Sequence, residues 1–306
     1  MKLKITKEIL RLRFNQMAIN DSMNPNIIDG KGCLICSTNS YNVLISYNKP
    51  DQYEIACGLG AEGYSRRWVE CSQCGFIYSL YSRNKNIFGK LYETIYKDSN
   101  SYWRKESGDE LFQKIINLPD SESETKYRVK WIKDNIRQLQ KSQIIDTVTS
   151  PHNLLDIGGG SGVFAYEFKD DLWSPYVVDP DARGVFMEKY GIKFIKSCYQ
   201  PNLFSVKFDL VSLIYVLEHL ENPKVMMHDL HDDMEQGALL YIEVPDSICF
   251  QYKDQQDDIF NSCHLWMFNP YTLSELLHKT GFELVALQRV KTVRNYYGLM
   301  VLAIRR

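Results

Sequence analysis

The sequence predicts an α/β fold, a Rossmann-like, doubly wound sheet of seven strands with an antiparallel last strand. From about Asn153 onward, short apolar segments alternate with helical stretches. The first five segments are separated by enough chain for helical crossovers, which implies parallel strands. Only KTVRNYY separates the last two, so we expect a hairpin with one reversed strand at the sheet edge. The seven segments are NLLDI, PYVVD, KFIKS, FDLVSLIY, ALLYIEV, FELVALQRV and GLMVLAI.

The composition is that of an ordinary globular protein. The chain has 306 residues, 44% hydrophobic and 24% charged, and a length that suggests two domains. A net charge of −2 gives no support to a nucleic-acid partner. No apolar run reaches the ~18 residues of a membrane span. The start, MKLKITKEILRLRF, resembles an amphipathic helix rather than a signal peptide, so we expect a cytoplasmic protein with reduced cysteines.

Four cysteines form two close pairs near the N-terminal end. Their pattern is C-x₂-C, 34 residues, C-x₂-C, and Gly75 after the second pair permits a tight turn. Two such pairs are typical of a tetrahedral zinc site, and four thiolates leave no open position, so we predict a structural Zn²⁺. Two disulfides are the alternative, which a reducing compartment disfavours. The segments YNVLISYN and RRWVEC are expected strands of a small zinc-ribbon-like domain. The predicted ligands are Cys33, Cys36, Cys71 and Cys74.

A glycine-rich loop follows the first strand of the α/β region. An expected helix, VFAYEFKD, comes next, and this order brings backbone N–H groups against a ligand. The loop is not a dinucleotide fingerprint, because Val163 stands where the third glycine belongs, and it is not a phosphate-binding P-loop. Its pattern is D-x-G-x-G-x-G, formed by Asp156, Gly158, Gly160 and Gly162.

The acids around this loop indicate the kind of ligand. Asp156 would add negative charge beside a diphosphate, whereas it suits an ammonium group. Asp179 closes the next strand, 23 residues later, near the ~20-residue spacing at which an acid binds ribose hydroxyls. The expected ligand therefore has a ribose, a cationic amine and no phosphate.

Three segments, LLDIGGGSG, VVDP and FDLVSLIYVLEHLENP, resemble the motifs of class I S-adenosylmethionine (SAM)-dependent methyltransferases. The resemblance runs from about Tyr127 to the C-terminal end. It implies that Gly158 and Gly160 lie against the methionine part and that Asp156 helps hold the amine through water or a loop amide. It also implies that Asp179 binds the ribose diol. Farther along the cofactor, it assigns Pro180 and Cys198 to the adenine end and Tyr215 to the neighbourhood of the sulfonium.

Two histidines are candidates for chemistry. Glu218 and His219 match a pair that, in this family, often begins the helix after the fourth strand and shapes the wall of the pocket. The alternative is that Glu218 and His219 take part in catalysis themselves. HLWMFNPYTLSELL is similar to the family's H-x-x-x-F-S stretch, which makes His264 the candidate general base. Because aromatic and apolar residues follow it, a satisfied core histidine is the competing interpretation.

The zinc segment ahead of the methyltransferase motifs resembles bacterial methyltransferases that act on sugar nucleotides, including deoxysugar C-methyltransferases. Those enzymes carry Tyr-x-Glu-His, where this sequence has Asn261, Ser262, Cys263 and His264. The difference favours O-methylation of a hydroxyl, on a sugar or sugar nucleotide made for a glycan or natural product. The open alternatives are C-methylation of a deoxysugar, methylation of another small molecule, and a non-catalytic SAM-fold protein that uses the zinc module for docking.

The predicted organisation has four parts: an N-terminal helix and linker (1–30), the zinc-binding domain (31–82), a helical linker or cap (83–150) and the SAM-dependent methyltransferase domain (151–306). Within the third part, the polar stretch LPDSESET predicts a helix start ahead of YRVKWIKDNIRQLQ. We expect a small-molecule acceptor and no nucleic-acid or membrane partner; the sequence leaves the oligomeric state open.

Overall fold

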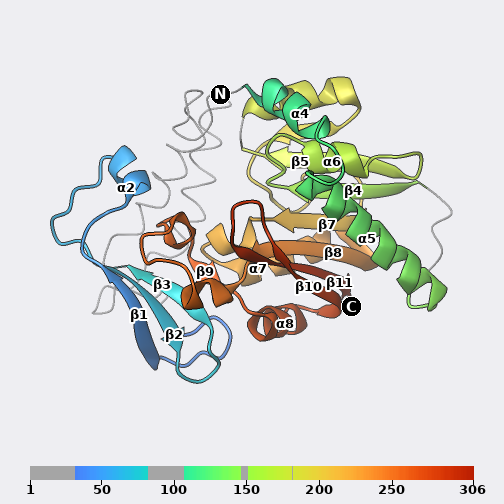
Figure 1. Ribbon diagram of the computed structural model, residues 1–306. Coiled ribbons are helices and arrows are strands. Elements are labelled where there is room, and N and C mark those ends of the chain that lie inside the picture. The colour runs from blue at the N-terminus through green and yellow to red at the C-terminus, as the bar shows by residue number, and fades with distance from the viewer. Residues whose placement is uncertain (1–31, 82–106, 146–150, 181) are drawn as a thin grey trace.

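Two β-sheets lie next to each other in the computed structural model (Figure 1), which describes residues 32–81, 107–145, 151–180 and 182–306. The helix expected within residues 1–30 and the start of the predicted cap lie outside these residues. Among the described residues, none of the helices has the length and apolar character to cross a membrane.

The large sheet contains all seven predicted strands, in the spatial order β10-β11-β8-β7-β4-β5-β6. Five of them are parallel, and β11 runs antiparallel to both of its neighbours. The strands are β4 (His152–Ile157), β5 (Trp173–Asp179), β6 (Lys193–Lys196), β7 (Phe208–Ile214), β8 (Met234–Pro245), β10 (Phe282–Lys291) and β11 (Tyr297–Arg305).

The sequence predicts the reversed strand at the edge of the sheet, and this is wrong. β11 is inserted between β8 and β10, and β10 is the edge strand. Burial explains this order. The central seven residues of β11 are all buried, whereas most of β10 is half-buried or exposed. A nearly continuous apolar strand gains most when both of its faces are covered, so it takes the interior position.

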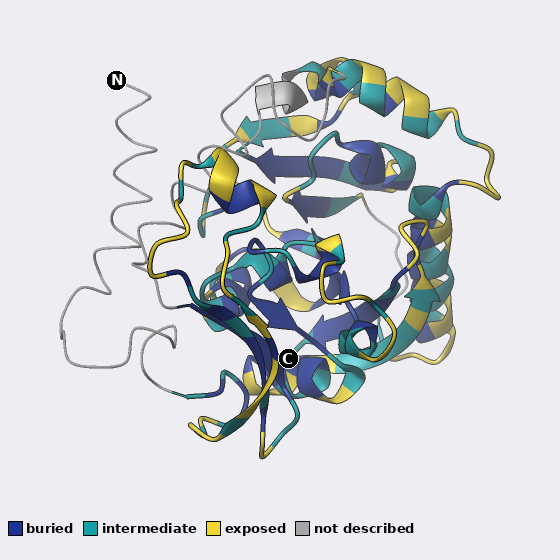
Figure 2. Ribbon diagram, turned by 60° about the vertical axis from the view of Figure 1, so that its left-hand side comes forward, coloured by how far each residue is buried: buried dark blue, intermediate teal, exposed yellow. Residues whose placement is uncertain are grey.

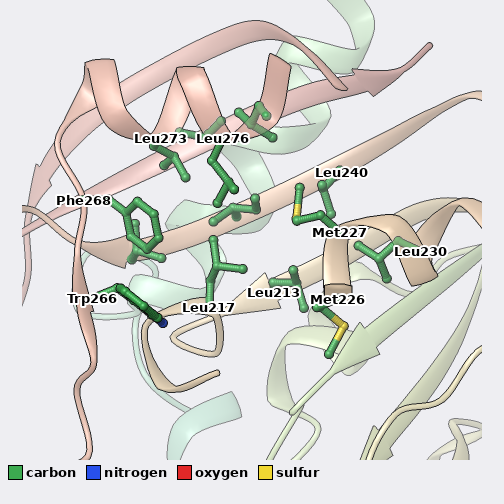
Figure 3. Close-up of a cluster of buried hydrophobic side chains, with 14 of the residues drawn as sticks. Leu213, Leu217, Met226, Met227, Leu230, Leu240, Trp266, Phe268, Leu273 and Leu276 are labelled. Atoms are coloured by element: carbon green, nitrogen blue, oxygen red, sulfur yellow. The ribbon is translucent and has the colours of Figure 1, made fainter. Parts of the chain in front are cut away.

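Helices cover both faces of the large sheet. One face packs on α5 (Glu124–Lys141) and α6 (Val163–Phe168), and the other on α7 (Pro223–Asp229) and α8 (Pro270–Lys279). Neighbouring residues of the strands alternate between these two cores: Leu154 lies in the first and Leu155 in the second. Figure 3 shows the second core, where Leu273 and Leu276 of α8 approach Phe268 and the central strands.

The helix starts follow from local sequence. Ser123, within the predicted polar break, caps α5 by accepting a hydrogen bond from the Lys126 amide at 3.2 Å. Ser107 and Glu110 form a capping box at the start of α4 (Gly108–Ile116). These N-terminal capping residues set the first residues of α4 and α5, the described helices of the segment 83–150.

The small sheet is antiparallel, with the order β1-β2-β3-β9. The first three strands are β1 (Tyr41–Tyr47), β2 (Arg66–Cys71) and β3 (Ile77–Tyr81); a short helix, α2 (Gln52–Ala56), lies between β1 and β2. The fourth strand, β9 (Trp266–Met267), comes from the far end of the chain, and neither it nor β3 was expected from the sequence.

A shared core joins the two sheets. Phe76 of the small sheet stacks on Trp266 with ring centroids 5.8 Å apart and lies 5.3 Å from the Phe268 ring. The cluster that contains these rings continues into α8 and the large sheet. In Figure 2 the inner strands of both sheets are largely buried, whereas exposed residues gather on loops, outer helix faces and the edge strands. The small sheet is therefore packed as part of the same structure.

Candidate cofactor and acceptor site

The strand order defines one crevice on the large sheet. The chain runs outward from β4 through β5 to β6 and then returns to place β7 on the other side of β4. In open α/β sheets, ligands bind at the carboxyl ends of the strands where the order reverses in this way. The predicted cofactor residues follow four adjacent strands at this edge: Tyr215 after β7, the glycine loop after β4, Asp179 and Pro180 at the end of β5, and Cys198 after β6.

The glycine loop needs its glycines for conformation and for close approach. Gly158, Gly160 and Gly162 have φ angles of 72°, 55° and 73°, a region that favours glycine. A Cβ on Gly158 would lie 2.7 Å from the Val216 side chain, which follows β7. A Cβ on Gly159 would lie 2.6 Å from Asp156 Oδ2. A Cβ on Gly160, by contrast, would meet no atom of the described residues within 4 Å, so a ligand has room against its backbone on this side.

Asp179 contacts the loop directly. Its Oδ2 accepts a hydrogen bond from the Gly160 amide at 2.9 Å, and the residue is buried. This contact ties the tip of β5 to the loop after β4, which are the two positions that the sequence had paired around one ligand.

Asp156 lies beneath the loop. It is 1% exposed; its Oδ1 accepts a hydrogen bond from Ser212 Oγ at 2.7 Å, and its Oδ2 has no partner among the described residues. The pKa of Asp156 is raised to about 7, chiefly by burial. The hydrogen bond from Ser212 acts against this shift, and the negative charge of Asp179 adds to it. A cation above the loop would favour the ionised form of this carboxyl group.

Three further predicted residues surround the crevice. Tyr215 has a φ of 54°, a left-handed conformation that costs a non-glycine residue energy and is common at functional sites. Its ring packs edge-on against Tyr296. Ser197 donates a 3.1 Å backbone hydrogen bond to Asp179, which brings the following Cys198 near Pro180 at the same sheet edge.

A second group of polar residues lies just beyond β7. Glu218 and His219 belong to the 3₁₀ helix η3 (Leu217–His219), and His264 precedes β9. One ligand atom of each of the three lies within 4.8 Å of the others. Glu218 is 0% exposed and neither of its carboxyl oxygens has a hydrogen-bond partner among the described residues.

Backbone carbonyls orient both histidines. His219 Nδ1 lies 2.8 Å from the Cys263 carbonyl and His264 Nδ1 lies 2.7 Å from the Ile259 carbonyl. Because a carbonyl only accepts, each Nδ1 carries the proton, and each Nε2 is the ring nitrogen that has the lone pair. Burial lowers the pKa of His219 to about 3 and that of His264 to about 4, so both rings are neutral near pH 7.

The small sheet anchors the segment that carries His264. Arg66, 2% exposed, donates to the Phe260 carbonyl at 2.7 Å, and Trp68 Nε1 donates to the same oxygen at 3.2 Å. Asp51 accepts a hydrogen bond from Ser262 Oγ at 2.9 Å. Ile259 and Phe260, which precede His264, are buried. Sequence reasoning did not identify these anchors, because no local motif links residues about 200 positions apart.

A buried ion pair holds α5 on the crevice side of the sheet. Arg128 binds both carboxylate oxygens of Glu243 on β8, and Tyr241 donates to the same carboxylate at 2.8 Å. The pKa of Glu243 is lowered, because the attraction of Arg128 outweighs burial. Glu243 is therefore a partner of α5 within the described structure.

The four cysteines of the predicted metal site lie together. The sulfurs of Cys33 and Cys74 are 3.5 Å apart, those of Cys36 and Cys71 are 3.4 Å apart, and all four lie within 4.8 Å of one another. No disulfide joins them. The residue after each pair, Ser37 or Gly75, has a positive φ, so both pairs form similar turns.

This geometry suits a tetrahedral ion, which would hold four sulfurs about 3.8 Å apart at Zn–S distances of about 2.3 Å. Burial raises the pKa of the Cys33 thiol to about 11. Four thiolates at these distances would repel one another, so the ionised form of the cluster requires a cation.

The fold defines the chain as an α/β protein with a crevice at its topological switch point. A family model described as "Methyltransferase domain" matches residues 124–287, more than half of the chain. The chain therefore belongs to this methyltransferase family, and it is a SAM-dependent methyltransferase. A search of curated proteins gave no match.

Several solved structures are similar at low identity. The 1,6-didemethyltoxoflavin-N1-methyltransferase of Burkholderia thailandensis has a TM-score of 0.49 at 15% identity, over 80% of this chain and 96% of that chain. The magnesium protoporphyrin IX methyltransferase of Synechocystis has a TM-score of 0.45 at 13% identity, over 65% and 94%. Their names give different acceptors, so they do not identify the acceptor of this chain.

Proposed function

We propose that the chain transfers a methyl group from SAM to a hydroxyl of a sugar or sugar nucleotide, in the cytoplasm, with His264 as the general base. The observation that carries this proposal is the His264 imidazole, which is neutral near pH 7 and whose Nδ1 is bonded to the Ile259 carbonyl, so that Nε2 is the ring nitrogen that can accept a proton. A hydroxyl acceptor must lose its proton during methylation, and a positioned lone pair is the group that takes it.

The cofactor residues are assigned along the sheet edge. Gly158, Gly160 and Gly162 hold the methionine part, Asp179 the ribose diol, and Asp156 the amine through the loop. Pro180 and Cys198 lie toward the adenine, and Tyr215 lies beside the sulfur. The open space over Gly160 and the unpartnered Asp156 oxygen support these assignments. When bound, SAM supplies a methyl group on a positively charged sulfur. The protein orients the acceptor oxygen toward that methyl group, and His264 Nε2 accepts the hydroxyl proton.

The choice of acceptor depends on the combination of a four-cysteine module with methyltransferase motifs, which resembles sugar-nucleotide methyltransferases. Asn261 and Cys263 stand where the C-methylating members carry the tyrosine and the glutamate, so we assign O-methylation rather than C-methylation. Mass spectrometry of sugar nucleotides incubated with SAM labelled in its methyl group tests the acceptor class. Label that appears only in other small molecules would contradict it.

His264→Ala tests the base. We expect turnover to fall by ~10²–10⁴, while the affinity for SAM stays unchanged, because the ring does not contact the glycine loop. Calorimetric titration with SAM and a turnover assay on the same preparation separate the two effects. His228→Ala, which removes an exposed ring on α7, is the matched control. A His264→Ala protein with full turnover would assign the ring to the core instead.

We further propose that Cys33, Cys36, Cys71 and Cys74 bind a structural Zn²⁺ within a zinc module of residues 31–82. Their geometry and their four equivalent thiols support this, since a closed set of sulfur ligands leaves no position for substrate. The ion would hold together the turn before β1 and the turn that connects β2 to β3. Through β2 and Asp51, the sheet then fixes the segment before His264.

A further inference from the structure

The four-cysteine cluster is contacted by a helix of the large sheet. α8 lies beside the small sheet (Figure 1), and Lys279 in its last turn donates a hydrogen bond to the Ile35 carbonyl at 2.7 Å. Ile35 stands between Cys33 and Cys36 in the first cysteine turn. Its buried side chain belongs to the core cluster that also contains Leu273 of α8. The methyltransferase part of the chain therefore contacts the turn that carries two of the proposed zinc ligands.

One peptide group connects Lys279 to a ligand sulfur. Its carbonyl is that of Ile35, which accepts from Lys279, and its N–H is that of Cys36. Burial raises the pKa of the Cys33 thiol, and hydrogen bonds from the Cys36 and Ile35 amides act against this rise; the Ile35 amide lies 3.4 Å from the sulfur. A cation at the carbonyl polarises the peptide group and makes its N–H a stronger donor. Lys279 thus acts on the Cys33 sulfur through the backbone.

Lys224 brings a second positive charge to the same place. It is half-buried in the first turn of α7, which contains no acidic residue, and it makes no ion pair among the described residues. The positive end of the helix dipole disfavours a cation at this position. The pKa of Lys224 is lowered by burial and by the charge of Lys279, whereas Cys33 raises it, so Lys224 lies within electrostatic range of both.

A zinc-loaded cluster would give this charge a partner. Four protonated thiols carry no charge, whereas Zn²⁺ with four thiolates carries two net negative charges. Glu275, 3.3 Å from Lys279, offsets part of the charge of Lys279, so Lys224 is the cation that depends more on the cluster. Away from bulk water, such an attraction is screened less than one between exposed charges.

We propose that Lys224 and Lys279 stabilise a zinc ion bound by the four cysteines, by compensating the negative charge of its thiolates, and so couple metal binding to the packing of the small sheet on α7 and α8. This inference rests on the zinc site of the proposed function, and it depends on neither the acceptor nor the reaction. The coupling is reciprocal, because an ion that binds more tightly when the two parts are packed together also stabilises that packing.

The zinc affinity of the full-length chain tests this inference. The zinc-loaded protein is titrated with a chromophoric zinc chelator, and zinc per chain is followed by absorption and native mass spectrometry. We expect Lys224→Met and Lys279→Met each to weaken zinc binding by about 10- to 100-fold, the usual range for outer contacts of metal sites. Lys130→Met, which removes an exposed lysine on α5, is the matched control and should bind zinc like the wild type.

Two further measurements separate charge from packing. Lys279→Arg keeps the positive charge and should retain most of the affinity that Lys279→Met loses. Added salt should weaken zinc binding by the wild type more than by the double variant Lys224→Met/Lys279→Met, because salt screens the attraction between charges. The comparison of wild-type protein at two salt concentrations needs no variant to fold.

Unchanged zinc affinity in both methionine variants would overturn the inference and leave the zinc site standing. Equal losses in Lys279→Met and Lys279→Arg, with the same salt dependence in the wild type and the double variant, would also overturn it. A wild-type chain that binds no zinc would contradict the zinc site and this inference together. Calorimetry with SAM on the same samples, expected to be unchanged, shows that the large sheet is folded and keeps these outcomes apart from a failure of the methyltransferase proposal.

Discussion

The large sheet and the small sheet are stabilised in different ways. The large sheet buries both faces under helices, and its central strands are apolar nearly throughout. The small sheet has about fifty residues of its own and includes β9 from the far end of the chain. One cysteine pair precedes β1, and the other lies where β2 turns into β3. A unit of this size rarely has enough core for independent stability. We infer that the metal and the shared core replace the missing second layer.

Each sheet also supports a different part of the proposed site. The glycine loop and Asp179 belong to the large sheet alone, whereas the segment that orients His264 is held by Arg66, Trp68 and Asp51 of the small sheet. Damage to the small sheet should therefore affect acceptor chemistry and leave the cofactor site intact.

Cys71→Ser should have the largest effect. Loss of one thiolate removes the closed ligand set, and structural zinc in comparable modules contributes about 10–16 kcal/mol of apparent binding free energy. We expect zinc release, loss of the folded small sheet and loss of turnover, with SAM affinity within about threefold of the wild type. Zinc content by mass spectrometry, limited proteolysis, a turnover assay and SAM calorimetry measure these four outcomes.

Cys57→Ser is the control for Cys71→Ser, because Cys57 lies outside the four-cysteine cluster. Retention of one zinc per chain in the Cys71→Ser protein would contradict the structural role. A parallel loss of SAM binding would show that the cofactor site depends on the small sheet.

Asp179→Ala should have the converse effect: it should weaken the binding of SAM and leave the small sheet unchanged. It removes the acceptor for the Gly160 amide and the proposed contacts to the ribose diol, at a cost on the order of 1–3 kcal/mol in SAM binding, or roughly five- to 150-fold. Zinc content and the small sheet should stay unchanged. Asp171→Ala removes an exposed acid near the same strand and is the control. Equal SAM affinities for the two variants would place the ribose elsewhere.

The large sheet was predictable because its signals are local. Strands such as β4 and β7 are short apolar runs, and the loop after β4 carries its glycines in sequence, so pattern and motif were sufficient. The interior position of β11 was missed because hairpin geometry alone does not say which strand of the pair meets β8. The burial of β11 decided it.

The acceptor side depends on contacts between distant parts of the chain, which sequence patterns do not report. β9 is two residues long and pairs with β3 almost 190 positions earlier. The roles of Arg66 and Asp51 follow from that pairing and have no signature of their own. Glu218 and His219 were visible as a motif, but the approach of His264 and the unpartnered state of Glu218 became visible only in three dimensions.

The smallest expected effect is a pH dependence of SAM affinity that belongs to the large sheet. Asp156 has a pKa raised to about 7, chiefly by burial, so the ligand-free protein carries it mostly protonated below pH 7. A bound ammonium group favours the ionised form and lowers this pKa, so binding releases a proton below pH 7. Affinity should therefore rise with pH up to about 7, by at most about tenfold per pH unit, and then level off until the SAM amine itself titrates near pH 7.7–8.0.

Calorimetry between about pH 5.5 and 7.5 measures this dependence, and Asp156→Asn is the control, because an amide of the same shape cannot titrate. The variant should show a flatter profile. If the wild-type and Asp156→Asn profiles have the same slope, Asp156 does not sense the cofactor amine, and Glu218, whose pKa is raised to about 8 by burial, becomes the group to test next. Because Glu218 lies where the segment anchored by the small sheet meets the crevice, a slope that follows Glu218 would mean that the two sheets share the cofactor site instead of dividing it.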